Sequence, residues 1–177
     1  MSTYRIRCVN SRDDLRSCFA AIGGAFSPPI PPDDWRLDRL LEHFEDSRPL
    51  MVVAERDGEI VGGALGLVTD DRFGVNILAF DDSVRGIGLG RRVMQTVEVQ
   101  AMARGARELG LGSVREARGF YESIGYAGKR TYKHKALPLP GRVRDLRVAK
   151  LQAALGDLDE GQLVEADAET GDVPALW

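Results

Sequence analysis

Residues 75–94 read Val-Asn-Ile-Leu-Ala-Phe-Asp-Asp-Ser-Val-Arg-Gly-Ile-Gly-Leu-Gly-Arg-Arg-Val-Met, an apolar strand that runs into a glycine-rich turn and then into an amphipathic helix. The glycines at 86, 88 and 90 keep side chains away from the backbone, so several N–H groups can point into one concavity. The start of the helix adds unpaired donors and a partial positive charge at the same place. This combination predicts a site for a phosphate or pyrophosphate group.

The spacing of the glycines separates this turn from two common phosphate loops. A Walker loop needs Gly-x4-Gly-Lys-Ser/Thr, and neither Gly-Lys-Ser nor Gly-Lys-Thr occurs in the chain. A dinucleotide-binding turn needs Gly-x-Gly-x-x-Gly, but counting from Gly86 puts Arg91 at the third glycine, although Glu108 lies where a ribose-binding acid could sit. Residues 85–90 alone also leave open a glycine-rich turn that binds no ligand.

A second motif follows in the stretch Ala-Arg-Gly-Phe-Tyr-Glu-Ser-Ile-Gly-Tyr at 117–126. We expect a short helix here, with Ser113 as its N-cap and Glu116 completing a capping box. Gly125 stands where a left-handed residue ends a helix. The apolar stripe at helical spacing consists of Val114, Ala117, Phe120 and Ile124. Tyr121 lies beside this stripe, so its ring can pack while its hydroxyl faces a cleft.

Together the two motifs resemble those of the GNAT acyltransferases, which bind acetyl-CoA. Residues 85–90, Arg-Gly-Ile-Gly-Leu-Gly, are similar to that family's Arg/Gln-x-x-Gly-x-Gly/Ala signature, and residues 117–126 are similar to its Ala-x-x-Phe-Tyr-x-x-x-Gly-Phe/Tyr pattern. The resemblance covers roughly residues 4–137, and its specific part is 75–126. It implies an α/β fold with a mixed, mostly antiparallel sheet flanked by helices.

The remaining sequence predicts elements in the order that this fold needs. The helices are expected after Ser11, around residues 35–44, at 89–104 and at the Tyr121 segment, and Asp57-Gly58 is a hairpin turn. The strands are expected at 4–9, 50–56, 59–68, 73–80, 107–112 and 127–137.

The resemblance also implies a transferase reaction and roles for particular residues. The reaction is transfer of acetyl, or a related acyl group, from acyl-CoA as cosubstrate to a primary amine by direct attack, without a metal. Tyr121 would return a proton to the departing thiolate. The backbone of Leu78, Ala79 and Phe80 would hold the pantetheine arm and polarise the acyl carbonyl. The remaining donor-binding residues would be Arg85, Gly86, Ile87, Gly88, Leu89, Gly90 and Arg91 around the pyrophosphate, with Arg92 adding charge and Ser113 at the pantetheine.

The sequence departs from the family at the general base. Many relatives carry a glutamate on the strand before the turn, but the comparable positions here are Gly74 and Asn76. Asp70 and Asp71 are candidates through water, or are simply turn residues, and the histidines at 43 and 134 are more often structural. Because the general base is missing, an alternative stays open: the chain is a non-catalytic CoA-binding or protein-interaction module on the same scaffold.

The acceptor amine is poorly specified. In this family it enters between the first two helices and the later hairpin, which here means residues 24–35 and the turn at 70–71. Four acids, Asp33, Asp34, Asp70 and Asp71, suggest a mouth that favours a cationic amine, although each also suits a cap or a turn. A small-molecule amine and a protein amine both remain open.

Composition sets broad limits on the class of protein. The chain has 177 residues, a net charge of −3 and 44% hydrophobic residues, values that are typical of a single globular domain and argue against general nucleic-acid binding. No apolar run is long enough for a transmembrane helix, and the N-terminus lacks the apolar region of a signal peptide. We therefore expect a cytoplasmic protein without membrane contact, in which Cys8 and Cys18 are reduced.

The last forty residues form a separate unit in the sequence. We expect a domain over 1–137 and an extension over 138–177, with a basic helix at 142–155 and an acidic tail after Lys150. The segment Gln162–Ala166 has the only later strand pattern, while the first 137 residues supply six strands of the seven that a GNAT sheet usually has. We expect this tail to pack on the sheet or on the partner subunit of a homodimer.

Overall fold

The computed structural model describes residues 2–159 except 27, 47–48, 129–131 and 138–156. Its elements are β1 (Thr3–Cys8), α1 (Arg12–Gly24), α2 (Trp35–Glu42), β2 (Pro49–Arg56), β3 (Glu59–Thr69), β4 (Arg72–Phe80), α3 (Leu89–Ala103), β5 (Glu108–Gly112), α4 (Arg118–Ser123), β6 (Tyr132–Ala136) and β7 (Asp157–Asp159). The seven strands form one sheet in the order β6-β5-β4-β3-β2-β1-β7. Only the pair β4–β5 is parallel, so the predicted mixed, mostly antiparallel sheet is confirmed.

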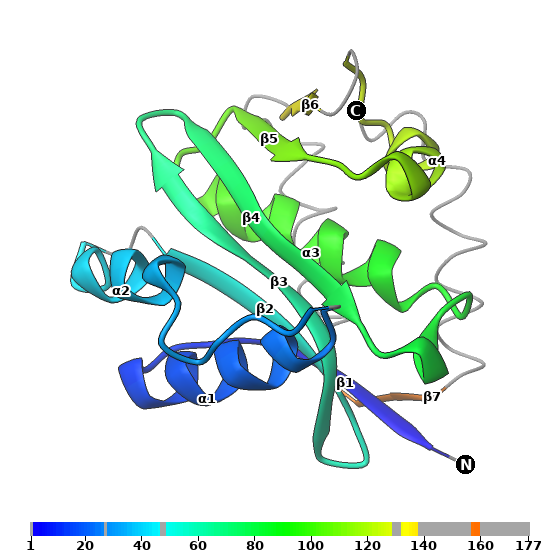
Figure 1. Ribbon diagram of the computed structural model, residues 1–177. Coiled ribbons are helices and arrows are strands. Elements are labelled where there is room, and N and C mark those ends of the chain that lie inside the picture. Colours follow the sequence, from blue (N-terminus) through cyan, green and yellow to red (C-terminus); the bar gives the residue numbers. More distant parts are fainter. Residues whose placement is uncertain (1, 27, 47–48, 129–131, 138–156, 160–177) are drawn as a thin grey trace.

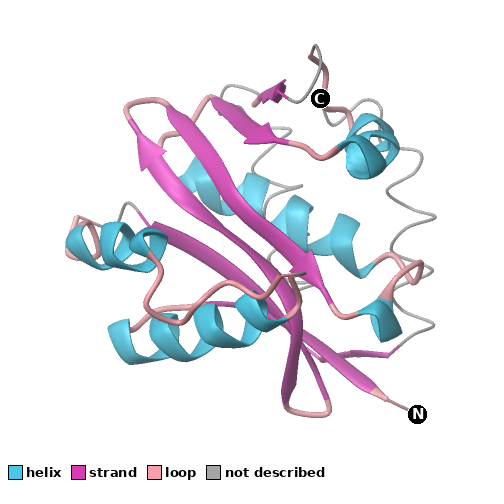
Figure 2. Ribbon diagram, viewed as in Figure 1, coloured by secondary structure: helices cyan, strands magenta, loops and turns pink. Residues whose placement is uncertain are grey.

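Helices cover both faces of the sheet, as expected. Figures 1 and 2 show α1 and α2 on one face and α3 on the other. Each face has its own buried cluster: Phe19, Ile22 and Leu40 pack under α1 and α2, while Val93 and Val97 of α3 pack on the opposite side. The central strands are therefore buried on both sides and form a rigid support for the segments at their ends.

Local sequence signals determine several of these boundaries. The side chain of Ser11 accepts a hydrogen bond from the backbone N–H of Asp14 and so caps α1 as predicted. Asp57 and Gly58 both have positive φ angles, 52° and 88°, which is the geometry of the tight hairpin predicted there. Gly125 ends α4 with a φ of 89°, also as predicted.

Strand β4 leaves its parallel neighbour halfway along its length. It pairs with β3 from Arg72 to Phe80. At Asn76 there is a bulge, because Val75 and Ile77 pair with the consecutive residues Gly66 and Leu65 and leave Asn76 as the extra residue. Its pairing with β5 ends at Val75. From Asn76 onward the edge of β4 that faces β5 has no strand partner among the described residues, so the sheet opens there into a splay.

The start of the Tyr121 helix differs from the prediction. Residues Arg115–Ala117 form a 3-10 turn and α4 begins at Arg118. The hydroxyl of Ser113 bonds the carbonyl of Val114 instead of capping the helix, so no capping box forms. Val114 is 67% exposed and lies outside the apolar stripe, because the 3-10 turn changes the phase between it and the later residues.

The tail contributes a strand, although not in the predicted segment. Residues Asp157–Asp159 pair antiparallel with Thr3–Arg5 at the outer edge of β1. The predicted strand at 162–166 and the predicted helix at 142–155 lie outside the described residues. Within the described part of the chain, no helix is long and apolar enough to cross a membrane.

Candidate functional site

The glycine-rich turn has the backbone geometry of an anion site. Gly86 and Gly88 have φ angles of 81° and 84°, a conformation that favours glycine. Gly88 is the N-cap of α3, a helix of 15 residues, and its carbonyl accepts from the N–H of Arg92. Apart from its chain neighbours, no described residue has an atom within 4 Å of where a Cβ of Gly86 would stand, so the turn is open on that side. The predicted strand, turn and helix are therefore present, and the free amides at the helix start can hold a phosphate.

The arginines near this turn are engaged elsewhere. Arg85 is exposed and pairs with Asp82 at 2.8 Å. Arg91 is half-buried, Arg92 is 6% exposed, and both already interact with other groups of the protein. The backbone amides are consequently the main donors that the turn offers to an anion.

Gly90 joins the turn to the other predicted elements. A Cβ on Gly90 would lie 3.5 Å from the ring of Phe80 and 3.5 Å from the ring of Phe120. The end of β4, the first turn of α3 and the helix α4 therefore meet at one point. Leu78, Ala79 and Phe80, the predicted backbone contacts, lie on the part of β4 that has left β5.

Tyr121 is 6% exposed and packs among aromatic rings. Its ring makes edge contacts with Phe120 at 5.1 Å and with Tyr126 at 5.9 Å between centroids. Burial raises the pKa of the Tyr121 phenol to about 12. The hydroxyl therefore stays protonated at neutral pH, which is the form that a proton donor needs.

A buried ion pair supports the helix that carries Tyr121. Lys135 of β6 donates to both carboxylate oxygens of Glu98 on α3, at 3.0 and 3.1 Å, and to the carbonyl of Ile124 at 2.8 Å. Glu98 is 1% exposed, and burial raises the pKa of its carboxyl while the charge of Lys135 lowers it. The sequence analysis missed this pair, because lysines that alternate with Tyr132 and His134 look like the solvent side of a strand.

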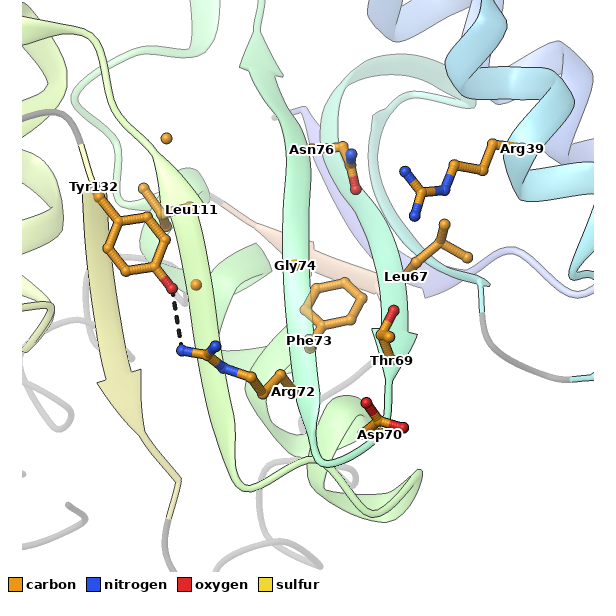
Figure 3. Close-up of a pocket in the computed structure, with 12 residues that line it drawn as sticks. Arg39, Leu67, Thr69, Asp70, Arg72, Phe73, Gly74, Asn76, Leu111 and Tyr132 are labelled. Carbon is orange, nitrogen blue, oxygen red and sulfur yellow. Dashed lines mark hydrogen bonds between the residues drawn. The ribbon is translucent and has the colours of Figure 1, made fainter.

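A cavity of about 480 Å³ opens at the splay, on the face of the sheet that carries α2 (Figure 3). It is lined by Arg39, Leu67, Thr69, Asp70, Arg72, Phe73, Gly74, Asn76, Gly110, Leu111, Gly112 and Tyr132. We propose it as the acceptor site and call it the acceptor cavity, because it borders the splayed part of β4 at Asn76. The cavity lies between α2 and β6. From the sequence, the acceptor was expected between the first two helices and the hairpin, without a contribution from β6.

The candidate bases are distributed unevenly around this cavity. Asp70 lines it at the β3–β4 turn, with a left-handed φ of 55°. From Arg72 to Asn76 the strand advances four residues, about 13 Å, so Asp70 lies at the end of the cavity away from the splay. Asp71 and the two histidines are not among the lining residues: His43 faces Asp46 at 3.7 Å, and His134 stacks against Tyr132.

The expected acidic mouth does not form at the cavity. Asp34 caps α2 and binds the guanidinium of Arg36 at 2.6 Å, which lowers the pKa of that carboxyl to about 2. Of the four acids in the prediction, Asp70 alone lines the described cavity, together with two arginines. Helix capping and turn formation therefore explain the other acidic positions better than the binding of a positively charged substrate does.

Other predicted groups lie apart from the site or within its wall. Ser113 is buried at the end of β5 and remains a prediction as a pantetheine contact. Cys18 is fully buried, and burial raises the pKa of its thiol to about 12, so it is not a nucleophile at neutral pH. Among the described residues, no group of three metal-ligating side chains converges on one point.

Comparison with known protein families gives one extensive match. A family model described as "Acetyltransferase (GNAT) family" matches residues 13–126. A blasticidin-S acetyltransferase from Streptomyces morookaense is 39% identical over 92 residues, which cover 46% of this chain and 64% of that protein. The chain thus spans less than two thirds of the length of this curated relative.

Solved structures share the fold at low sequence identity. The ribosomal-protein-S18-alanine N-acetyltransferase of Escherichia coli superimposes with a TM-score of 0.62 at 18% identity, covering 78% of this chain and 97% of that one. A GNAT family N-acetyltransferase of Escherichia coli in complex with CoA gives a TM-score of 0.60 at 18% identity, covering 78% and 83%. Both likenesses concern the arrangement of the elements.

Proposed function

The chain belongs to the GNAT family of acetyltransferase enzymes, and from that premise we propose that it transfers acetyl from acetyl-CoA to the primary amine of a small molecule. The observation that carries the proposal is the coincidence of three elements at Gly90: the splayed strand β4, the phosphate-binding turn and the Tyr121 helix. A neighbour of the same fold was crystallised with CoA, which supports an acyl-CoA donor.

The donor is proposed to lie along the free edge of β4. Its pyrophosphate is held by the amides of residues 85–90 and by the start of α3. Its pantetheine arm bonds the backbone of residues 78–80 and contacts Ser113. An amide of the same stretch polarises the thioester carbonyl, so that negative charge on its oxygen is stabilised as the amine attacks.

The reaction is a single displacement in two stages. The neutral amine nitrogen attacks the carbonyl carbon, a C–N bond forms, and the tetrahedral centre collapses with loss of the C–S bond. Tyr121 gives its proton to the departing thiolate, the nitrogen loses a proton to solvent, and Tyr121 regains a proton from solvent, so the products are the amide and CoA thiol. Among the described residues no acid or imidazole side chain lines the cavity near the splay, so we expect the amine to enter already neutral.

The relatives support an amine acceptor without identifying it. One is named a blasticidin-S acetyltransferase and another a ribosomal-protein-S18-alanine N-acetyltransferase. The acceptor cavity of this chain, about 480 Å³ and lined from several strands, suits a compact molecule better than an extended peptide. We therefore favour a small-molecule amine such as an antibiotic amine.

Two measurements test the proposal. Calorimetry should detect binding of CoA and acetyl-CoA, and the release of free CoA thiol should depend on an added amine from a broad panel. Binding of acetyl-CoA without thiol release for any amine would favour a non-catalytic module. Absence of CoA binding at millimolar ligand would reject the donor site as well.

A further inference from the structure

The acceptor cavity is larger than a simple alkyl amine requires. Its volume of about 480 Å³ lies within the range of sites for drug-sized ligands. The attacking nitrogen has to reach the splay beside Asn76, so the rest of the acceptor occupies the space between Asn76 and the β3–β4 turn. The surface and the charges of that space therefore determine which acceptors fit.

Glycines form the floor of the cavity. Gly74 of β4 lies directly opposite Gly110 of β5, and Gly112 follows on the same face. Among the described residues outside their own chain neighbours, no atom lies within 4 Å of where a Cβ would stand on Gly74 or on Gly112. At these two glycines the sheet consequently presents bare backbone to the cavity, and a planar ring can lie flat on it.

Tyr132 forms an aromatic wall above this floor. Its hydroxyl lies 2.6 Å from where a Cβ of Gly110 would stand, so the ring leans across that glycine. Arg72 donates a hydrogen bond to the hydroxyl at 3.4 Å (Figure 3). The ring also stacks on His134, with 6.1 Å between the ring centroids. A ring held at both ends offers a fixed surface to a flat ligand.

Arg39 supplies a positive charge on the opposite side. It extends from α2 into the cavity beside Asn76 and Leu67 (Figure 3). Arg72 is bound to Glu108, whereas no hydrogen bond or ion pair joins Arg39 to another residue in the described part of the chain. One guanidinium without a partner matches one singly charged oxygen group of a ligand.

We propose that the acceptor cavity selects primary amines that carry a flat ring and a carboxylate, with the ring on the Gly74 floor beside Tyr132 and the carboxylate on Arg39. The inference rests on the proposed function, since it names the acceptor of the same reaction. Asp70 and Arg72 at the far end then face the part of the acceptor that lies most distant from its amine.

A set of matched amines tests the charge. Because Arg39 and the attacking amine both lie beside Asn76, the probes carry the two groups meta on the ring: 3-(aminomethyl)benzoate, its neutral amide 3-(aminomethyl)benzamide, and the ringless 5-aminopentanoate. Calculated on the concentration of neutral amine, the kcat/KM of the benzoate should be about tenfold or more above that of each of the other two. Equal or better use of the benzamide overturns the carboxylate, and equal or better use of 5-aminopentanoate overturns the ring.

Variants of Arg39 locate the preference in this cavity. In Arg39→Gln the ratio of the kcat/KM for the benzoate to the kcat/KM for the benzamide should fall to about one, which is the loss expected when the charged partner of the carboxylate is removed. Arg39→Lys, which retains the charge, should retain part of the advantage. A ratio of benzoate to benzamide that is unchanged in Arg39→Gln contradicts the assignment.

A size series at Gly74 tests the floor. The φ of Gly74 is ordinary and its side-chain position is open, so Ala, Val and Leu can replace it without backbone strain. The KM for the benzoate should rise with the size of the side chain, while the melting temperature and the affinity for acetyl-CoA stay unchanged. Gly24→Ala, another open position that does not line the cavity, is the control. A KM that is independent of size excludes the floor as the ring site.

Direct binding separates this inference from the proposed function. Saturation-transfer NMR of the benzoate with the full chain and CoA reports ring contacts whether or not transfer occurs. Binding that weakens in Arg39→Gln, together with no thiol release, would support the cavity and reject the transferase. Thiol release from ringless or uncharged amines, together with no binding of the benzoate, would support the transferase and reject the ring-and-carboxylate preference of the cavity.

Discussion

At the scale of single residues, Tyr121 determines how the proposed reaction responds to pH. Its phenol has a pKa raised to about 12 by burial, so it remains a proton donor throughout the neutral and mildly alkaline range. We expect kcat to show no decline with a pKa near 10. Tyr121→Phe should lower kcat by about 10²–10⁴-fold without changing the affinity for acetyl-CoA. Tyr126→Phe, the buried neighbour 5.9 Å away, is the matched control and should keep kcat.

The same pKa shift has a defined effect on stability. A phenol whose folded pKa lies above its unfolded value of about 10 stabilises the fold fully below that pH and loses the contribution as the pH rises toward 12. Alkaline unfolding of Tyr121→Phe should therefore begin at a higher pH than that of the wild type, measured by circular dichroism. An identical onset would contradict the raised pKa, and a kcat that Tyr121→Phe leaves unchanged would make Tyr121 a packing residue.

Gly86 allows a clean test of the anion site. Aspartate and asparagine both tolerate the left-handed backbone found there, and no described residue beyond the chain neighbours lies within 4 Å of the position of the new Cβ. Gly86→Asp should weaken CoA binding by about tenfold or more relative to Gly86→Asn, because a carboxylate would repel the phosphates. The difference should shrink at high salt. Calorimetry measures the CoA affinity of the two variants. Equal affinities would show that the phosphates do not bind at this turn.

At the scale of elements, the pair Glu98–Lys135 ties α3 and β6 to the end of α4. Glu98→Gln or Lys135→Met alone leaves a buried charge without its partner and should cost about 3–5 kcal/mol of unfolding free energy. The double variant Glu98→Leu/Lys135→Met removes both charges and should recover most of that loss. Urea unfolding measures all three variants. Additive losses in the double variant would contradict the coupling.

Elements also show where sequence reasoning succeeds and where it stops. The glycines at 86 and 88 located the turn between β4 and α3, and Asp57-Gly58 located the hairpin that leads into β3. Both predictions succeeded because such signals act within a few residues. Ser113 misled the prediction for α4, since a local capping pattern says nothing of the 3-10 turn that precedes the helix. The inward lysine at 135 was missed because its partner Glu98 lies on a distant element.

The same limit applies to the acceptor cavity. Its walls come from α2, β3, β4, β5 and β6, and no short motif joins them. The bare floor could have been suspected from Gly74 and from the Gly-Leu-Gly at 110–112, but the pairing of Gly74 with Gly110 depends on the register of a parallel strand pair. Register between distant strands follows from packing of the whole sheet.

At the scale of the whole molecule, residues 157–159 of the tail are a part of the sheet. Residues 157–159 form three cross-strand pairs with β1, each worth about 0.2–1 kcal/mol. Truncation after Leu137 should therefore lower the unfolding free energy by about 1–2 kcal/mol and leave the outer edge of β1 unpaired. Thermal unfolding tests the stability, and sedimentation tests the predicted homodimer. A truncated protein with the same melting temperature and the same mass in solution would show that the tail is dispensable.

The pairing of β1 with β7 also ties folding to the direction of synthesis. β1 leaves the ribosome more than a hundred residues before β7 does. Throughout that interval the outer N–H and C=O groups of residues 3–5 lack their final strand, although the six other strands can already pair. An open edge invites pairing with another nascent chain, so the protein is most exposed to co-translational aggregation just before residue 159 appears.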